Sequence, residues 1–197
     1  MGNREDLLES ARRCIVEKGY ARTTARDIAG GAGVSLAAIG YHFGSKEALM
    51  TEALLDTGIR IGDALDDALR GASSTELLGR IWDRSLAVFG DQRALLAASM
   101  ENLAQVDRIP AVADRMRAAQ RAAVEGIAEL LAEPLPQATE AERRALAAYY
   151  FAVINGLAIV WLIDPEIVPT GDRLRLAELG AGGTGAGGTA AGADEAS

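Results

Sequence analysis

The side chains best suited to catalysis or metal binding are scarce in this sequence. It contains one histidine, His42, and one cysteine, Cys14. A Ser-His-Asp or Cys-His system needs a histidine beside its nucleophile, so none can form away from the segment around His42. A single cysteine excludes an internal disulfide and a multi-cysteine metal site, and with one histidine it argues against a dedicated transition-metal sensor. We expect no catalytic residues, no metal site and no cofactor.

One glycine-rich stretch has the spacing of a dinucleotide-binding loop. Residues 180–185 match the Gly-x-Gly-x-x-Gly pattern, but that motif needs a strand before it and a helix after it, and neither is expected here. Residues 180–197 are almost wholly Gly, Ala and Thr and offer no bulky apolar side chain for burial. We therefore interpret the match as a coincidence and expect a disordered tail.

Apolar residues recur with the period of an α-helix from the start of the chain. In the first segment they occupy one helix face, on which Cys14 should be a buried, unreactive thiol, and Gly19 ends the segment. The residues that form this face are Leu7, Leu8, Ala11, Cys14 and Ile15. No stretch alternates with period two over the length of a strand, so the fold class is all-α.

Helix caps and breaks divide the rest of the chain. Thr23 or Thr24 can cap a second helix, Ser35 a third and Ser45 a long fourth. The expected helices span about 24–32, 36–41, 46–69, 75–91, 93–107, 110–132, 140–163 and 172–179. This pattern predicts an N-terminal helical domain over 1–50, a larger helical domain over 51–179 and the tail over 180–197.

The charge is distributed unevenly between these parts. The whole chain has a formal net charge of −8, but residues 1–50 hold seven Lys or Arg against six Asp or Glu, and the remainder holds thirteen against twenty-two. A slightly basic head on an acidic body suits a protein whose N-terminal part faces nucleic acid. The excess is too small to identify such a head by charge alone.

The spacing in residues 23–46 predicts a helix-turn-helix. Ile28 anchors the first helix, and Ala29 is small enough for a second helix to cross close to it. Gly33 suits the left-handed conformation of a tight turn, Val34 fills that turn, and Ile39 returns to the same core. Such a pair usually places its second helix in the DNA major groove.

Residues 5–55 resemble the DNA-binding domain of the TetR family of transcriptional regulators. The resemblance rests on Lys18-Gly-Tyr-Ala-Arg-Thr-Thr, Arg26-Asp-Ile-Ala, Ala32-Gly-Val-Ser and, most specifically, Tyr41-His-Phe-Gly-Ser-Lys-Glu-Ala-Leu. Further on, Asn155-Gly-Leu-Ala-Ile-Val-Trp-Leu-Ile-Asp-Pro is similar to the penultimate helix of many members. Residues between about 70 and 140 match only in helical pattern.

The resemblance implies a set of DNA contacts. Thr24, Tyr41, His42 and Lys46 are expected to touch phosphates, which positions the protein without reading sequence. Arg26 and Ser35 are the polar candidates near base edges. The exposed positions of the recognition helix are Leu36, Ala37, Ala38 and Gly40. None of these four can form a bidentate hydrogen bond to a base, so we hypothesise that the helix reads thymine methyls and groove shape.

A second departure from the family pattern is the pair Gly30-Gly31 near the end of the first motif helix. Each glycine costs about 1 kcal/mol relative to alanine in a helix. We therefore expect a head that is somewhat loose before DNA binds.

The resemblance also implies an effector and a dimer. A small, largely apolar organic molecule should bind among the helices of 75–160 and favour a conformer whose heads are wrongly spaced for a near-palindromic operator. The bulky candidates for this site are Trp82, Phe89, Met100, Met116, Tyr149 and Tyr150, and the polar ones are Glu101, Asn102, Arg117 and Asn155. Bulky residues at helical spacing are more often ordinary core. The homodimer should form through the helices at about 140–163 and 172–179.

Other interpretations remain open at this point. Residues 145–163 carry no formal charge and are long enough to span a membrane, but Asn155-Gly156 favours a helix buried on all sides, as at a dimer interface. The N-terminus has no apolar signal segment, which predicts a cytoplasmic protein. The alternatives to a ligand-released repressor are an activator, a helical protein that binds DNA without sequence choice or binds a partner, and an all-α small-molecule enzyme.

Overall fold

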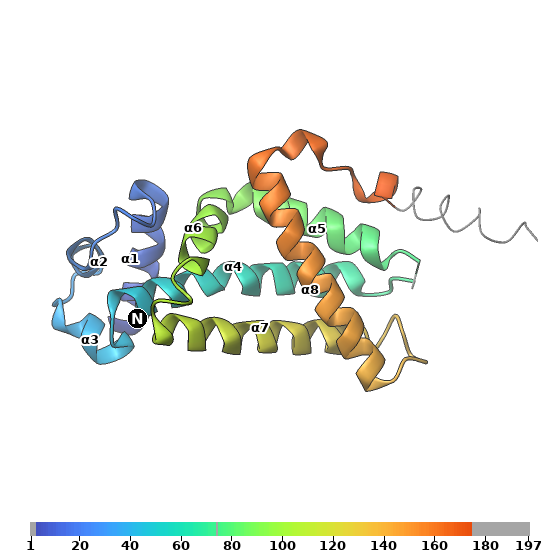
Figure 1. The fold of residues 1–197 in the computed structure, drawn as a ribbon, viewed down its shortest axis with the longest axis horizontal. Coiled ribbons are helices and arrows are strands. Elements are labelled where there is room, and N and C mark those ends of the chain that lie inside the picture. Colours follow the sequence, from blue (N-terminus) through green and yellow to red (C-terminus); the bar gives the residue numbers. More distant parts are fainter. Residues whose placement is uncertain (1–2, 74, 175–197) are drawn as a thin grey trace, which may run out of the picture.

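The computed structural model describes residues 3–73 and 75–174, and within these ranges the chain forms helices and no strand. The predicted all-α class is confirmed. Figure 1 shows a small head formed by the first three helices at one end of an elongated helical body. The helices are α1 (Asn3–Lys18), α2 (Ala25–Gly31), α3 (Ala37–Phe43), α4 (Lys46–Leu69), α5 (Leu77–Asp91), α6 (Arg93–Leu103), α7 (Pro110–Leu130), α8 (Glu140–Ile163) and the 3-10 turn η1 (Pro165–Ile167).

The predicted caps mostly determine where the helices of the head begin. Thr24 is the N-cap of α2, and the hydroxyl of Ser45 accepts a hydrogen bond of 3.1 Å from the amide of Ala48 at the start of α4. The prediction for Ser35 was wrong. The third helix begins at Ala37, with Leu36 at the N-cap and no side-chain cap bond. The backbone carbonyl of Ser35 instead accepts from the amide of Ala38 in a tight turn.

The body is built on two long helices that leave the head together. In Figure 1, α4 and α7 lie side by side and run from the head to the far end, and α8 crosses them obliquely. α5 returns along α4, and α6 brings the chain back against α1. The sixth helix is shorter than predicted and ends at Leu103, after which a turn leads to Ile109.

Two hydrophobic clusters lie along α4. The first joins the three head helices to the beginning of α4 and also takes in Leu95 and Ala98 of α6. The second lies among the far half of α4, α5, α7 and α8 and includes the fully buried Leu65 and Phe89. α4 is one continuous helix that contributes to both clusters, so it joins the far half of the body directly to the head.

α8 combines an apolar composition with incomplete burial. It is the one helix of the described residues with the length and mean hydropathy (2.0) of a membrane span, and 28% of that segment is buried within the chain. Its outward side carries Tyr149, Ile159 and Ile163, which are 54%, 47% and 81% exposed. The expectation of burial on all sides is therefore not met by a single chain. Residues 171–174 begin a further helix, and the remainder of the predicted helix at 172–179 and the tail lie outside the described residues.

Candidate DNA interface and ligand cavity

The helix-turn-helix is held by the apolar contacts that its spacing predicts. Ile28 and Ala29 of α2 and Ile39 of α3 are each at most 4% exposed and belong to one cluster. Gly33 has a φ of +68°, and the amide of Val34 donates to the carbonyl of Ala29 at 3.0 Å. The predicted turn is thus confirmed, because the left-handed residue reverses the chain directly above the α2 core.

The glycine pair of α2 has two different explanations. A Cβ placed on Gly31 would lie 2.4 Å from Oγ of Ser10, whose buried hydroxyl donates to the carbonyl of Ile28 at 2.8 Å. A guanidinium nitrogen of Arg13 donates to the carbonyl of Gly31 at 2.9 Å. Gly31 is therefore a close-approach position between α1 and α2. A Cβ on Gly30 would meet nothing within 4 Å, and no contact explains that glycine.

The predicted DNA-contacting residues lie on α2, α3 and the turns that flank them. Most of them are exposed, and Tyr41 is the most prominent, with 86% of its surface accessible. The exposed set is Thr24, Arg26, Ser35, Leu36, Ala37, Gly40 and Tyr41, and the half-buried set is Ala38, His42 and Lys46. The recognition helix thus presents an apolar surface with an aromatic ring at its C-terminal end.

Thr24 is tied into a capping box at the start of α2. Its hydroxyl accepts from the amide of Asp27 at 3.2 Å and donates to a carboxylate oxygen of Asp27 at 2.6 Å. The other oxygen of Asp27 receives a hydrogen bond of 2.5 Å from the ammonium of Lys18. These bonds, first Lys18 and then Thr24, hold the pKa of Asp27 well below its usual range. The hydroxyl of Thr24 therefore already has partners within the head.

The basic residues of the head differ in how far they are engaged. Lys46 donates to the carbonyl of Thr23 at 3.2 Å and lies 3.6 Å from a carboxylate oxygen of Glu47, so it also fixes the turn before α2. Arg26 is exposed, and its guanidinium has no hydrogen bond or ion pair with any described residue. Arg22 is exposed and uses only Nε, on the carbonyl of Lys18. Arg22 was not among the predicted DNA contacts, although its position two residues before Thr24 can be read in the sequence.

A buried polar contact joins the head to the body. The Tyr20 hydroxyl donates to Oδ1 of Asn102 at 2.9 Å, and the Thr51 hydroxyl lies 3.0 Å from the same oxygen. Nδ2 of Asn102 points at the sulfur of Met116, 3.7 Å away. A guanidinium nitrogen of Arg115 on α7 donates to the carbonyl of Phe43, the last residue of α3, at 3.3 Å. Two predicted ligand residues, Asn102 and Met116, thus lie in the contact between head and body.

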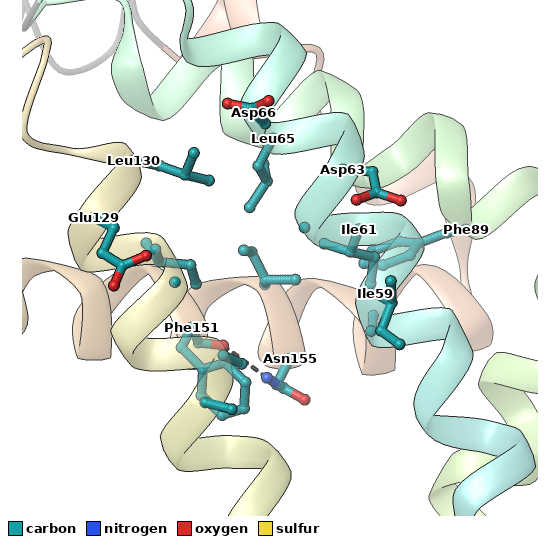
Figure 2. Close-up of a pocket in the computed structure, with 18 of the residues that line it drawn as sticks. Ile59, Ile61, Asp63, Leu65, Asp66, Phe89, Glu129, Leu130, Phe151 and Asn155 are labelled. Atoms are coloured by element: carbon teal, nitrogen blue, oxygen red, sulfur yellow. Dashed lines mark hydrogen bonds between the residues drawn. The ribbon is translucent and has the colours of Figure 1, made fainter.

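A cavity of about 570 Å³ lies farther along α4, between α4, α7 and α8 and closed by single residues of α5 and α6. Its walls are mainly aliphatic, with the rings of Phe89 and Phe151 (Figure 2). Its lining is Gly58, Ile59, Ile61, Gly62, Asp63, Leu65, Asp66, Phe89, Leu96, Ala122, Ala123, Gly126, Ile127, Glu129, Leu130, Phe151, Ile154, Asn155 and Ala158. The volume is sufficient for a drug-sized organic molecule.

Of the ten residues proposed for the ligand, Phe89 and Asn155 line this cavity and the others lie elsewhere. Trp82 donates to the carbonyl of Pro169 at 2.7 Å, and Arg117 pairs with Asp114 at 2.5 Å. Tyr150 belongs to the buried cluster, and the exposed Tyr149 lies beside it with ring centroids 5.6 Å apart. Met100 and Glu101 lie on α6 and are not among the residues that line the cavity.

Small residues on facing helices create the cavity, and they were its signal in the sequence. Gly58 and Gly62 are one helical turn apart on α4, and Gly126 faces them from α7. A Cβ on any of the three would meet nothing within 4 Å. The predicted ligand residues were bulky or polar, whereas the space itself comes from the absence of side chains at these three glycines.

Both the head and the body of the chain match models of known protein families. Residues 7–53 match the family model described as bacterial regulatory proteins, tetR family, and residues 74–179 match the C-terminal domain of BetI-type transcriptional repressors. The regulator TtgR of Pseudomonas putida is 32% identical over 178 residues, which cover 84% of this chain and 82% of TtgR.

Solved structures give the same picture for the fold. A transcriptional regulator of Pseudomonas aeruginosa superposes with a TM-score of 0.65 at 24% identity, covering 93% of this chain and 91% of that one. A regulator of Saccharomonospora viridis, solved in complex with choline, superposes with a TM-score of 0.61 at 27% identity, covering 88% and 92%.

Proposed function

The chain belongs to the TetR family of transcriptional regulators, and on that premise we propose that it is a homodimeric repressor released from a near-palindromic operator when a small organic molecule enters the α4–α7–α8 cavity. As a member of this family it is a ligand-responsive DNA-binding regulator and not an enzyme. The sequence comparisons support the family assignment. The cavity and its connection to the head support the proposal.

The observation that carries the proposal is that α4 and α7, two of the helices that form the cavity, also hold the head. α4 continues directly from the turn after α3. Arg115 on α7 donates a hydrogen bond to the carbonyl of Phe43, the last residue of α3. Cavity residues Gly62 and Gly126 lie on these same two helices. A molecule that separates α4 from α7 at the cavity would therefore shift the position of α3, the recognition helix. Such a molecule binds the conformer with the shifted helix better than the DNA-binding conformer, and this difference in affinity drives release from DNA.

For the DNA contacts we propose the exposed face of the head. Tyr41, Arg26 and Lys46 would face the backbone and groove edges, with Thr24, Ser35 and His42 beside them. Leu36, Ala37, Ala38 and Gly40 would lie against the bases. Because the hydroxyl of Thr24 is held by Asp27, its contribution to a phosphate contact would be weaker than that of Tyr41, whose hydroxyl is exposed.

For the dimer we propose the outward side of α8 together with the helix that begins at residue 171. This side carries Ala148, Ala152, Gly156, Ile159 and Ile163 at helical spacing, all of them exposed in the single chain. Such an apolar stripe on a soluble regulator requires a partner surface, and two copies related by a two-fold axis provide it. This pairing accounts for the hydropathy of α8 without a membrane and agrees with a cytoplasmic location. We also propose the domain division at about residue 50, within α4.

The test uses the full chain, a fluorescent duplex from the region upstream of its gene, and a panel of organic compounds selected by their effect on the thermal midpoint. A compound that binds the cavity should weaken DNA binding by a factor within about 5 to 150. The variant Gly126→Phe occupies the cavity and should abolish the compound's effect on DNA binding. Gln120→Phe, on the exposed side of α7, is the matched control. Cavity binding that leaves DNA affinity unchanged in the unmodified protein would contradict the proposal.

A further inference from the structure

The polar side chains of the cavity share one chemical property. They are Asp63 and Asp66 on α4, Glu129 on α7 and Asn155 on α8, and every one presents an oxygen. The lining includes no Lys, Arg or His and no hydroxyl-bearing residue. Figure 2 shows the carboxylates of Asp63 and Glu129 approaching the cavity from two different helices.

The amide of Asn155 adds one acceptor with a fixed orientation and one N–H that is not used within the chain. Its Nδ2 donates to the carbonyl of Phe151 at 2.7 Å, drawn as the dashed line in Figure 2. That bond fixes the orientation of the amide, because the reversed orientation would place two carbonyl oxygens against each other. Oδ1 and the second N–H of Nδ2 are thus the groups of Asn155 available to a ligand. The second N–H of Asn155 is the single hydrogen-bond donor among the lining side chains, which otherwise offer carboxylate and amide oxygens.

The carboxylates differ in their availability. Asp66 pairs with Arg70 at 2.9 Å, so its charge is partly compensated. Asp63 and Glu129 are exposed, and their carboxylates have no hydrogen bond or ion pair with any described residue. Two uncompensated negative charges therefore lie at the edge of an apolar space, and the low dielectric of that space strengthens their field inside it.

The remaining lining agrees with a cationic occupant. The rings of Phe89 and Phe151 border the cavity, and the faces of such rings attract cations. An anion would face three carboxylates and no cationic side chain among the lining residues. A neutral molecule that carries several acceptor groups would find one side-chain donor for them, that of Asn155, and burial of the other acceptors costs affinity.

Resting on the proposed function, we infer that the effector is a bulky hydrophobic organic cation, a quaternary or protonated amine or an equivalent onium ion. Its apolar part would fill the space between Ile127, Ile154 and Phe151, and its positive centre would lie toward Asp63 and Glu129. The cavity would thus follow a simple selection rule: its effector carries a positive charge and is bulky.

Tetraphenylphosphonium and tetraphenylborate test this rule, because they have nearly the same shape and opposite charge. Binding of each to the full chain is measured by calorimetry, with the neutral dye Nile red as a probe of the cavity itself. The cation should bind at least tenfold more tightly than the anion. Asp63→Asn and Glu129→Gln should each weaken the cation by roughly three- to tenfold, and the double variant should remove most of the preference.

The controls are Asp67→Asn and Glu133→Gln, neighbouring exposed carboxylates that do not line the cavity, and both should leave cation binding unchanged. Equal or tighter binding of the anion, or cation binding that is unaffected in the double variant, would overturn the inference. If neither ion binds while Nile red still enters and is excluded by Gly126→Phe, the inference fails and the proposed function stands. If no probe enters the cavity, both fail.

Discussion

The Tyr20 hydroxyl and Oδ1 of Asn102 lie 2.9 Å apart, 82 residues apart in the chain, in the buried contact between the head and the body. Tyr20 is 9% exposed and Asn102 is 3% exposed. Burial, with smaller contributions from Glu47 and Glu101, raises the pKa of Tyr20. The neutral hydroxyl is therefore the form that holds the head against α6.

Replacing Asn102 tests the strength of this contact. Asn102→Leu leaves the buried hydroxyl of Tyr20 without its acceptor, which should lower the free energy of unfolding by about 1–3 kcal/mol. Tyr20→Phe removes the donor but leaves Asn102 with Thr51, so its cost should be nearer about 1 kcal/mol. The measurement is urea unfolding of both variants. A larger loss for Tyr20→Phe than for Asn102→Leu would show that the contact does not work in this way.

The two glycines of α2 should respond in opposite directions to the same substitution. Gly30→Ala places a methyl in open space and should stabilise the head by up to about 1 kcal/mol. Gly31→Ala places one 2.4 Å from Oγ of Ser10 and should destabilise it. The second substitution should be tolerated better in a Ser10→Ala background. Thermal unfolding measures all three, and equal shifts for the two alanines would refute the close-approach role of Gly31.

Asp27 should make the stability of the head dependent on acid pH. Its folded-state pKa is depressed below the unfolded value, so its contribution is fully present above the unfolded pKa of about 4 and is lost as the pH falls through the lower folded value. Unfolding followed from neutral to acid pH should show this loss in the unmodified protein and less of it in Asp27→Asn. Asp107→Asn, an exposed carboxylate in the turn after α6, is the control and should follow the unmodified curve. Identical curves for all three proteins would remove the role given to Asp27.

Operator analogues test how the apolar recognition helix reads DNA. Replacing a thymine opposite α3 by uracil removes one methyl, and burial of one such group is worth about 0.8 kcal/mol. Affinity should fall by about fourfold at each such position. Replacing guanine by 7-deazaguanine removes a major-groove acceptor and should have little effect. The reverse pattern would mean that direct hydrogen bonds from the head dominate recognition.

The scaffold of the head was predictable because local chemistry determines it. Thr24 and Ser45 cap the helices that follow them, and Gly33 has the positive φ that its turn requires. The Ser35 cap failed because the chain continues into a turn that delays α3 until Ala37. A capping residue indicates where a helix can begin, and the following turn decides whether it does.

The ligand site was less predictable because it depends on contacts between distant segments. Asn102 was proposed as a ligand residue because it is polar and lies within a helix, but its partner is Tyr20 in the head. The cavity itself is formed by aliphatic residues such as Ile154 and Leu96, which in a sequence look the same as core. Only the absence of side chains at Gly58, Gly62 and Gly126 distinguishes this region.

The central claim is that the head binds a particular DNA sequence as part of a regulator. The most direct measurement compares the dissociation constants of the full chain for a duplex from upstream of its own gene and for a shuffled duplex of equal length and composition, at about 0.15 M salt. The account predicts that the upstream duplex binds at least about a thousandfold more tightly. Equal affinities for the two duplexes, both lost steeply as salt rises, would contradict it and indicate binding to the phosphate backbone alone.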